Sequence, residues 1–294
     1  MKLTFYKGDT PNFGDDLNNI MWDALLAPGF LDDNEDELFL GIGSILWDSY
    51  PKKASKIVMG SGYGGYTDMP DLQEGSWDIA FVRGPRTAKA LNLDPKLAIT
   101  DAAILTRFMN LPAQPKKYKV SFMPHWESIP RGNWKQVCEH AGINYINPTD
   151  PNVLASLQAI QQTELLITEA MHGAILADTL RVPWLALEPI FPQHRNKWFD
   201  WSESMLIDLK FNTAPSSSIK DLWAHKTGKR GLGKRSQQLG SILSFTNSYF
   251  IDNAAEKMIT IAKNHGQLSN EKIFIEKSEL ALDKLAQYCK VKSL

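Results

Sequence analysis

The chain of 294 residues has few cysteines, no long apolar run and no excess of charge of either sign. Its two cysteines, Cys138 and Cys289, cannot build the disulfide framework of a small secreted protein, and neither has metal-ligand spacing. No apolar run approaches the roughly 18 residues that a membrane-spanning helix needs. Residues 1–8 turn polar too early for a secretory signal. We therefore expect a soluble, cytoplasmic protein.

Charge of opposite sign nearly cancels over the whole chain. There are 32 Lys and Arg against 33 Asp and Glu, a net charge of −1, whereas a nucleic-acid binder usually carries a basic excess. The sequence therefore predicts no nucleic-acid partner. The charge is uneven, since residues 1–112 hold 10 basic and 16 acidic side chains and residues 113–294 hold 22 and 17. Five basic residues and no acid lie in 226–235, which is typical of a solvated loop.

What the chain does have is enough apolar sequence, 43% of its residues, for two domains of ordinary size that share a cleft. Short β-favouring runs alternate with helical patterns and stop at glycine-bearing loops, which indicates an α/β fold with parallel sheets. Predicted strands are 3–7, 37–42, 56–59, 78–83, 98–100, 118–123, 143–146, 165–168 and 183–187. Predicted helices follow Asp15 or Asp16 and Gly84, and span 134–141, 153–162 and 169–181.

Two Rossmann-like domains follow from this pattern, with a linker at 111–117. We expect an N-terminal domain over 1–112, a C-terminal domain over 113–235 and a helical tail over 236–294 that packs back on the body. Ligands of such folds bind at the carboxyl edge of the sheet. Side chains that follow the strands are therefore the candidates for chemistry.

The loop 8–18 joins the first strand to the first helix. Backbone N–H groups at such a helix start, including that of Gly14, suit an anion. The adjacent Asp15 and Asp16 oppose the same anion, so at least one should cap the helix, accept a proton or hold a sugar hydroxyl. Two capping acids on an exposed turn remain the alternative.

Two arginines flank the next helix start, in Arg83-Gly84-Pro85-Arg86. A cation in the first turn of a helix is unfavourable by about 0.3–1 kcal/mol unless an anion compensates it. The planar guanidinium fork matches carboxylate or phosphate. Arg83 and Arg86 are therefore candidate anion ligands, and an ion pair between domains is the alternative.

Histidines end two strands of the second half, in Pro124-His125-Trp126 and in Glu169-Ala170-Met171-His172-Gly173. Histidine titrates near neutral pH and can exchange a proton with a substrate without large tuning. Glu169 lies three residues before His172 and could orient it. Single histidines are usually structural, but two at strand ends favour an acid–base role.

Residues 192–201 concentrate His194, Arg195 and Lys197 with two tryptophans. Cations beside flat aromatic faces suit an anionic donor or a sugar, and a buried aromatic plug under a loop is the alternative. The Gly60-x-Gly62-x-x-Gly65 run is not followed by a helix start, so dinucleotide binding is disfavoured. Motifs of serine hydrolases, P-loop enzymes and zinc enzymes are absent from the sequence.

Several of these motifs together resemble the polysaccharide pyruvyltransferase family, and most closely its branch that forms pyruvate ketals on exopolysaccharides. The resemblance spans about residues 5–205. It rests on Asn12-Phe13-Gly14-Asp15-Asp16-Leu17-Asn18, Gly41-Ile42-Gly43-Ser44, Val82-Arg83-Gly84-Pro85-Arg86-Thr87, Asp101-Ala102-Ala103 and Glu169-Ala170-Met171-His172-Gly173-Ala174.

The resemblance implies a two-domain fold like that of the B-type glycosyltransferases. It also implies transfer of an enolpyruvyl unit from phosphoenolpyruvate to two hydroxyls of a sugar, with release of phosphate and no metal or further cofactor. The family usually carries Arg where this chain has Ala170. We hypothesise that Arg195 or Lys197 replaces it in holding the donor.

We assign the following roles as a hypothesis. His172, His125 and Glu169 are the candidate catalytic residues; Arg83, Arg86, Arg195, Lys197 and Gly14 are candidates for donor binding; Asp15, Asp16, Trp126 and His194 are candidates for acceptor binding.

Two other functions fit the same sequence. One is a glycosyltransferase that uses a nucleotide sugar, and the other is a non-catalytic sugar-binding protein of envelope assembly. A lipid-linked acceptor would place the protein at the inner face of the membrane, where 226–235 could contact anionic head groups. The sequence assigns no oligomeric state.

Overall fold

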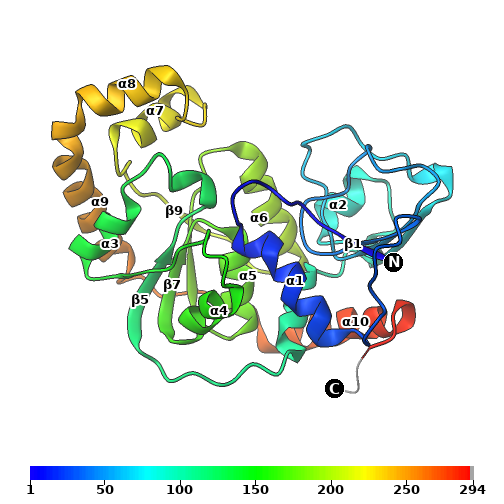
Figure 1. The fold of residues 1–294 in the computed structure, drawn as a ribbon. Coiled ribbons are helices and arrows are strands. Elements are labelled where there is room, and N and C mark those ends of the chain that lie inside the picture. Colours follow the sequence, from blue (N-terminus) through cyan, green and yellow to red (C-terminus); the bar gives the residue numbers. More distant parts are fainter. Residues whose placement is uncertain (292–294) are drawn as a thin grey trace. The chain divides into compact units, whose positions relative to one another are not determined.

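The computed structural model describes residues 1–291, and its fold contains two parallel sheets with helices on them (Figure 1). The chain forms two compact units. Unit 1 comprises Met1–Pro112, Gln193–Leu209 and Ser269–Leu294, and unit 2 comprises Ala113–Pro192 and Lys210–Leu268. The α/β class with parallel sheets and C-terminal helices is confirmed, while the predicted domain bounds stay a prediction.

The sheet of unit 1 has the order β1-β2-β3-β4, and every neighbouring pair is parallel. Its strands are β1 (Lys2–Thr4), β2 (Glu37–Leu40), β3 (Ser55–Met59) and β4 (Trp77–Phe81). The helices are α1 (Phe13–Leu25), α2 (Pro85–Ala90), α6 (Pro192–Ser204, all but its first residue in unit 1) and α10 (Glu271–Tyr288). Three short 3-10 helices, η1 (Leu72–Glu74), η2 (Pro95–Leu97) and η3 (Ala102–Phe108), complete it.

The predicted strand at 98–100 is wrong. Only Ala98 pairs there, in a single parallel bridge to Val82. Ala98 is the C-cap of η2 and Asp101 is the N-cap of η3, so the residues between these two helices serve the helix ends and form no ladder with the sheet.

The sheet of unit 2 has the order β6-β5-β7-β8-β9 and is also parallel throughout. Its strands are β5 (Tyr118–Met123), β6 (Asn144–Tyr145), β7 (Thr163–Thr168), β8 (Trp184–Leu187) and β9 (Phe211–Asn212). Its helices are η4 (Trp126–Ser128), α3 (Trp134–Ala141), α4 (Val153–Gln161), α5 (Met171–Thr179), α7 (Ile219–Thr227), α8 (Lys234–Ile242), η5 (Ser244–Thr246) and α9 (Asn247–Ile261). The segment 236–294 therefore contributes α9 to unit 2 and α10 to unit 1.

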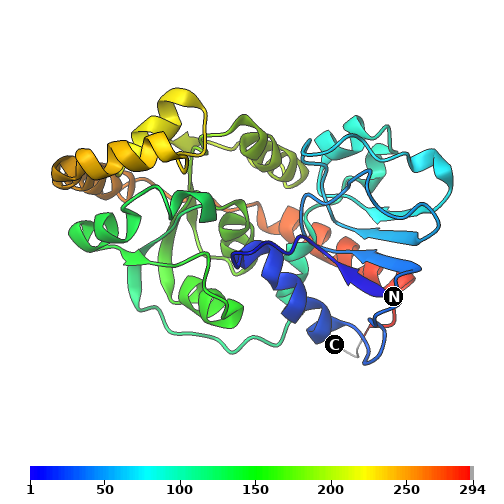
Figure 2. The same ribbon diagram turned by 45° about the horizontal axis from the view of Figure 1, so that its top comes forward.

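Each unit has its own apolar core. In unit 2, Phe122 and Ile167 of the central strands pack with Val137 of α3 and Met258 of α9, all fully buried. Burying side chains of this size stabilises the fold by about 1.5–3 kcal/mol each. The rotated view in Figure 2 shows α3 and α9 side by side at the edge of this unit. No helix among the described residues is long and apolar enough to cross a membrane.

A buried asparagine fixes the start of α1 against the end of β2. Asn18 Nδ2 donates to the Ile42 carbonyl (3.0 Å), and its Oδ1 accepts from the Ile42 N–H (2.8 Å) and from Trp22 Nε1 (2.8 Å). A Cβ at Gly41 would overlap Asn18 Oδ1 and lie 2.5 Å from Trp22 Nε1. The glycine of this turn is therefore required by close approach of the helix.

We expect Gly41→Ala to destabilise the protein by about 3 kcal/mol, since the added methyl group must displace a buried hydrogen-bonded side chain. Thermal and urea unfolding of wild type and variant measure the effect. Gly233→Ala is the matched control, because a Cβ there meets nothing within 4 Å. Equal stability of the two variants would contradict the proposed constraint.

Candidate functional site

The carboxyl end of β1 opens on a pocket of about 280 Å³ within unit 1. It lies between the loop after the strand and the first turn of α1. The polar side chains that line it include Tyr6, Lys7, Asn12, Asp15 and Asp16. Carboxylates, an amide and a phenol are groups that accept and donate hydrogen bonds to hydroxyls. The lining therefore suits a ligand rich in hydroxyl groups.

Asn12 organises the two acids of this pocket. Its Nδ2 donates to Asp15 Oδ2 (2.6 Å), and its backbone N–H donates to Asp16 Oδ2 (2.8 Å). Asn12 Oδ1 accepts the Gly14 N–H at 3.3 Å, which caps the helix. Asp15 and Asp16 thus serve the helix start and also face the pocket, and the Gly14 N–H already has a partner.

Arg83 follows β4 and is fully buried in unit 1. Its Nε lies 3.0 Å from Asp200 Oδ2, and its Nη1 donates to Ser44 Oγ at 2.8 Å. Asp200 also accepts the N–H (3.0 Å) and the hydroxyl (2.6 Å) of Thr87. Arg83 therefore forms an ion pair, as in the alternative, but with a partner in the same unit and not in another domain. The sequence did not identify that partner, Asp200 on α6.

Arg86 lies in the first turn of α2 and is half-exposed. Its Nη2 is 2.7 Å from Glu203 Oε1, and its guanidinium stacks over the Phe199 ring with 4.6 Å to the centroid. Glu203 is itself 41% exposed, so water screens this pair and its contribution to stability is small. The donor-binding roles of Arg83 and Arg86 stay predictions.

The segment 192–201 forms most of helix α6 in unit 1. Trp198 and Trp201, three residues apart, are buried and pack edge to face with 6.4 Å between ring centroids. His194 and Arg195 are half-buried, and Lys197 Nζ lies 5.4 Å from the centroid of the Tyr66 ring. The two tryptophans are therefore buried core residues, as in the aromatic-plug alternative. They lie on a helix, however, and not under a loop.

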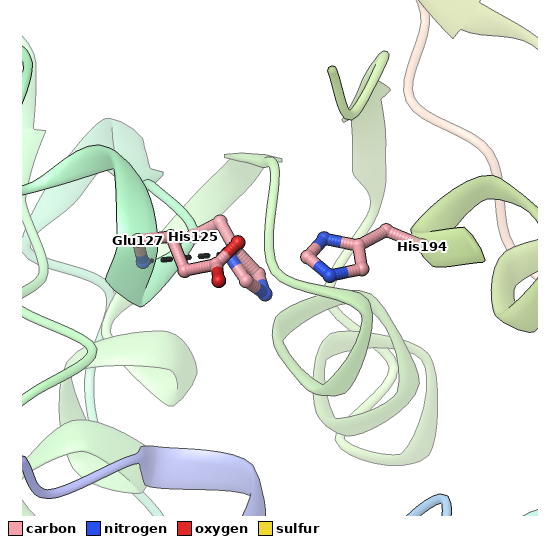
Figure 3. A group of neighbouring side chains, drawn as sticks. All are labelled: His125, Glu127 and His194. Carbon is pink, nitrogen blue, oxygen red and sulfur yellow. Dashed lines mark hydrogen bonds and ion pairs between the residues drawn. The ribbon is translucent and has the colours of Figure 1, made fainter. Parts of the chain in front are cut away.

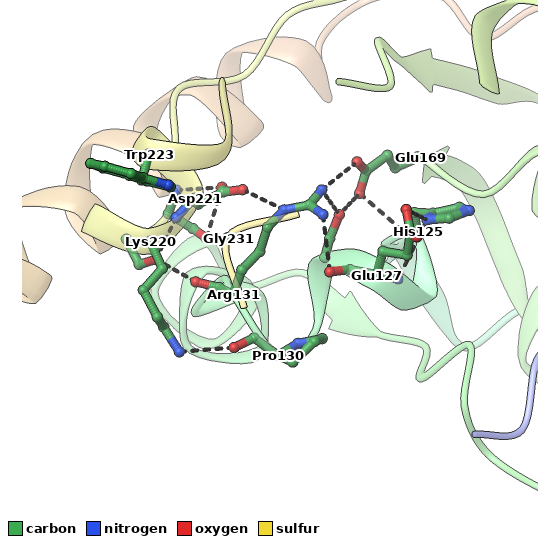
Figure 4. Close-up of polar contacts among 12 residues, drawn as sticks. His125, Glu127, Pro130, Arg131, Glu169, Lys220, Asp221, Trp223 and Gly231 are labelled. Carbon is green, nitrogen blue, oxygen red and sulfur yellow. Dashed lines mark hydrogen bonds and ion pairs between the residues drawn. The ribbon is translucent and has the colours of Figure 1, made fainter. Parts of the chain in front are cut away.

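In unit 2, the end of β7 holds the loop that follows β5 (Figure 4). Glu169 Oε2 accepts the His125 N–H (2.9 Å) and the Ser128 hydroxyl (2.6 Å). Glu169 Oε1 lies 3.6 Å from Arg131 Nη2. Among the described residues these are the polar contacts of the Glu169 side chain, so it positions the loop of His125 and makes no contact with His172.

Arg131 is the cation of this cluster, and it is also buried. Its Nε is 3.0 Å from Asp221 Oδ1, its Nη1 donates to the Glu127 carbonyl (3.0 Å), and its Nη2 donates to Ser128 Oγ (2.6 Å). No motif or spacing in the sequence selects Arg131 or Asp221. The only local signal was Ser218 three residues before Asp221, a helix-capping pattern that says nothing of Arg131.

Opposing effects act on the pKa of the Glu169 carboxyl group. Burial raises its pKa above the ordinary value of 4.5 and is the largest effect. The Arg131 charge and the hydrogen bonds from Ser128 and His125 act in the opposite direction, and the Asp221 charge raises the pKa further. The net result is a carboxyl group that keeps its proton to higher pH than an exposed glutamate.

His125 stands at the carboxyl end of β5 beside Glu127 (Figure 3). The Glu127 N–H donates to His125 Nδ1 at 3.4 Å, so the neutral ring carries its proton on Nε2. Glu127 Oε2 lies 3.8 Å from Nδ1 and would stabilise the ring when that nitrogen takes up a proton. Trp126 is half-buried, with its ring 5.9 Å from the His125 ring between centroids.

His172 occupies the first turn of α5, directly after the end of β7, and is half-buried. A Cβ at the following Gly173 would lie 2.5 Å from Thr168 Oγ1 and 3.0 Å from Met123 Sδ. The glycine thus lets α5 begin close to the strands. Ala170 stands before α5 with its N–H donating to Thr168 Oγ1 (3.0 Å).

Comparison with known proteins identifies the family of the chain. Residues 3–189 match the family described as polysaccharide pyruvyl transferase. The chain belongs to that family. It is also 40% identical over 224 residues to the succinoglycan biosynthesis protein ExoV of Rhizobium meliloti (strain 1021), which covers 74% of this chain and 69% of that protein.

The family match divides the predicted site residues of this chain into two sets. The first set lies within the matched residues 3–189. It contains both acids of the unit 1 pocket, both arginines near α2, and the strand-end residues His125, Trp126, Glu169 and His172. His194, Arg195 and Lys197 on α6 lie beyond the matched residues. The proposed roles of α6 therefore rest on this chain alone.

Because the pKa of Glu169 is raised, the folded protein holds more protons than the unfolded chain from about pH 4.5 up to that raised pKa. We expect the free energy of unfolding to fall as pH rises through this window, and Glu169→Gln to flatten that dependence. Chemical denaturation at pH values across the window measures it. Glu164→Gln, an exposed change on the same strand, is the control. Equal pH dependence in wild type and Glu169→Gln would contradict the assignment.

Proposed function

We propose that this protein transfers the enolpyruvyl unit of phosphoenolpyruvate to two hydroxyls of one sugar in a surface polysaccharide or its precursor. Membership of the polysaccharide pyruvyl transferase family carries the proposal, because that family acts on a sugar polymer. The similarity to a protein of succinoglycan biosynthesis supports an exopolysaccharide as the acceptor class. The products are a cyclic pyruvate ketal and inorganic phosphate.

The chemistry defines what the side chains must do. A general acid protonates the methylene carbon of phosphoenolpyruvate, and the adjacent carbon becomes electrophilic. One sugar hydroxyl attacks it and loses its proton to a base. The carbon–oxygen bond to phosphate then breaks, and the second hydroxyl closes the ring as its proton leaves with the phosphate. The reaction needs no redox step, and we propose that it uses neither a metal ion nor a cofactor.

His172 and His125 are the proposed acid and base, since both follow parallel strands of unit 2 at its carboxyl edge. The Glu127 carboxylate lies 3.8 Å from His125 Nδ1, so an acidic group faces this ring. Glu169 acts as a positioning residue for the His125 loop, through the hydrogen bond of 2.9 Å to the His125 N–H.

The donor is a small trianion that needs cations. We propose Arg195 or Lys197 for this role, because Ala170 stands where the family usually has Arg. Both side chains are half-buried on α6, where a cation keeps access to water and to a ligand, and the Lys197 ammonium lies 5.4 Å from the centroid of the Tyr66 ring. Arg86, Arg83 and the Gly14 N–H remain further candidates.

The acceptor is proposed to contact Asp15 and Asp16, which line the pocket of about 280 Å³ in unit 1. Carboxylates commonly accept hydrogen bonds from sugar hydroxyls, and the Tyr6 ring in the same pocket offers an apolar face. Trp126 and His194 are the other proposed acceptor contacts.

Incubation with phosphoenolpyruvate and candidate oligosaccharides tests the reaction directly. We expect release of inorganic phosphate together with a product heavier by one pyruvyl ketal unit in mass spectrometry. A glycosyltransferase would add a sugar from a nucleotide sugar and leave phosphoenolpyruvate intact. A non-catalytic binding protein would retain the oligosaccharide unchanged. Either result would contradict the proposal.

We expect His172→Ala to lower kcat for ketal formation by about 10²–10⁴-fold, the usual contribution of general acid–base catalysis. Phosphate release under saturating substrates gives the rate. His140→Ala, on α3 of the same unit, is the control because its exposed ring pairs only with the exposed Asp252 (2.9 Å) among the described residues. If the His172→Ala protein keeps more than about a tenth of the activity, His172 is neither the acid nor the base.

We expect Arg195→Ala to raise KM for phosphoenolpyruvate at least about tenfold, because a charge-assisted hydrogen bond contributes about 1.5–3 kcal/mol. Initial rates at varied phosphoenolpyruvate and fixed acceptor measure the change. Lys52→Ala removes an exposed cation of the same unit and should leave KM unchanged. An unchanged KM in both variants would remove Arg195 as the replacement for the family arginine.

A further inference from the structure

The segment 226–251 of unit 2 has a charge and surface unlike the rest of the chain. It contains five Lys and Arg and no Asp or Glu, whereas the full chain has a net charge of −1. It runs from the end of α7 through α8 and η5 into the first turn of α9. In Figures 1 and 2, α8 lies at the periphery of unit 2, away from its sheet. We call this segment the basic hairpin.

Large apolar side chains are exposed on the basic hairpin. Phe245 is 76% exposed, Ile242 is 71% exposed and Tyr249 is 68% exposed, while Leu232 is 41% exposed. Single exposed apolar residues are ordinary on protein surfaces. Four within eighteen positions, three of them exposed by more than two thirds, leave apolar area that unit 2 does not cover.

Helical spacing puts charge and apolar surface on the same outward side. Arg235 and Ile242 are seven residues apart, two turns of α8, and both are exposed. Ser236 lies on the inner side of this helix, buried with its hydroxyl donating to the carbonyls of Gly231 (2.6 Å) and Gly233 (2.8 Å). Phe245 and Tyr249 follow at intervals of three and four residues.

The cations of the hairpin are available to a partner. Arg230 Nε pairs with Glu127 Oε1 at 3.2 Å, which ties the loop between α7 and α8 to the body of unit 2. The other four are exposed and make no ion pair within the described residues: Lys226, Lys229, Lys234 and Arg235. Their charge therefore faces solvent without compensation.

We propose that the basic hairpin docks on the surface of a bilayer that contains anionic lipids. Its exposed apolar side chains would enter the boundary between head groups and acyl chains, and the neighbouring cations would meet lipid phosphates. Charge complementarity selects this occupant, because no acid in 226–251 opposes an anionic surface. Lysine is depleted from protein–protein interfaces, so the three exposed lysines of the hairpin favour lipid over a protein partner. The surface is distinct from the residues proposed for pyruvyl transfer.

Flotation of the full-length protein with extruded vesicles tests the proposal without any enzyme assay. We expect binding to vesicles of phosphatidylcholine with about 30% phosphatidylglycerol and little binding to pure phosphatidylcholine. Binding should weaken when NaCl rises from about 0.1 M to about 0.5 M, because salt screens the attraction. Equal binding to both vesicles, salt-insensitive binding or no binding would each overturn the proposal.

Variants locate the surface. Each cation near an anionic membrane contributes about 1 kcal/mol, or about fivefold in partitioning, so K234S/R235S should weaken binding about 30-fold. I242S/F245S should weaken it by about tenfold or more through loss of apolar insertion. Melting temperatures should stay at the wild-type value, because all four side chains are exposed.

Matched controls are K52S/K53S in unit 1, which removes two adjacent exposed cations, and Leu154→Ser in unit 2, which removes a leucine that is 45% exposed. Both should bind vesicles as wild type does. Equal losses in the control and hairpin variants would overturn the location. Sedimentation that shows a dimer which I242S/F245S abolishes, with vesicle binding unchanged, would assign the apolar surface to a second copy of the chain instead.

Discussion

The burial of one carboxylate governs the arrangement of the candidate catalytic edge. Glu169 lies at the end of β7 and accepts hydrogen bonds from the loop after β5, so two strand ends are joined by one side chain. Removing a carboxylate from water is costly, and Arg131 offsets that cost only in part. The Arg131 guanidinium is itself buried between Glu169 and Asp221, so loss of Arg131 leaves both acids without their cation, and leaving a buried charge uncompensated typically costs about 3–5 kcal/mol.

Unit 1 also has a buried acid paired with a buried arginine, close to the end of β4. Asp200 is buried and collects Arg83 together with the N–H and hydroxyl of Thr87. The arrangement fixes α6 against the start of α2, and so it fixes the backbone that carries Arg86, Arg195 and Lys197. In both units a buried acid anchors the framework, Glu169 in unit 2 and Asp200 in unit 1. Arg83, which the sequence marks as a candidate anion ligand, is thus bound to Asp200 and Ser44 within the protein.

Local sequence signals predicted the elements whose limits are set locally. Helix α3 has the predicted bounds because Gly142 adopts φ of +66°, a conformation that suits glycine and ends the helix. The carboxyl ends of β5 and β7 also lie where predicted, since Pro124 follows the buried end of β5 and Glu169 follows that of β7. The two-residue strand β9 is too short to leave a pattern, and its place depends on pairing with β8.

The hydrogen-bonding and ion-pair partners of the candidate residues could not be predicted from local sequence signals. Asp200 lies 117 positions from Arg83, and Asp221 lies 90 positions from Arg131. Nothing local marks either acid as the one of many that will be buried, because only the folded chain brings the pair together. The assignment of His125 and His172 to one sheet edge succeeded for the opposite reason: parallel strands place their carboxyl ends on the same side whatever the partner residues are.

The net charge of the whole chain does not describe the electrostatic potential at one part of its surface. A field in physiological salt decays over about 8 Å, so a surface responds to the charges within that range and not to the sum over the chain. The basic hairpin carries five positive charges over 26 residues in a chain whose total is −1. The compensating acids are elsewhere in the sequence and include Glu169, Asp200 and Asp221, which are buried beside their own cations. An acid paired inside the protein adds little to the potential outside it, so the field at the hairpin is positive although the chain as a whole is nearly neutral.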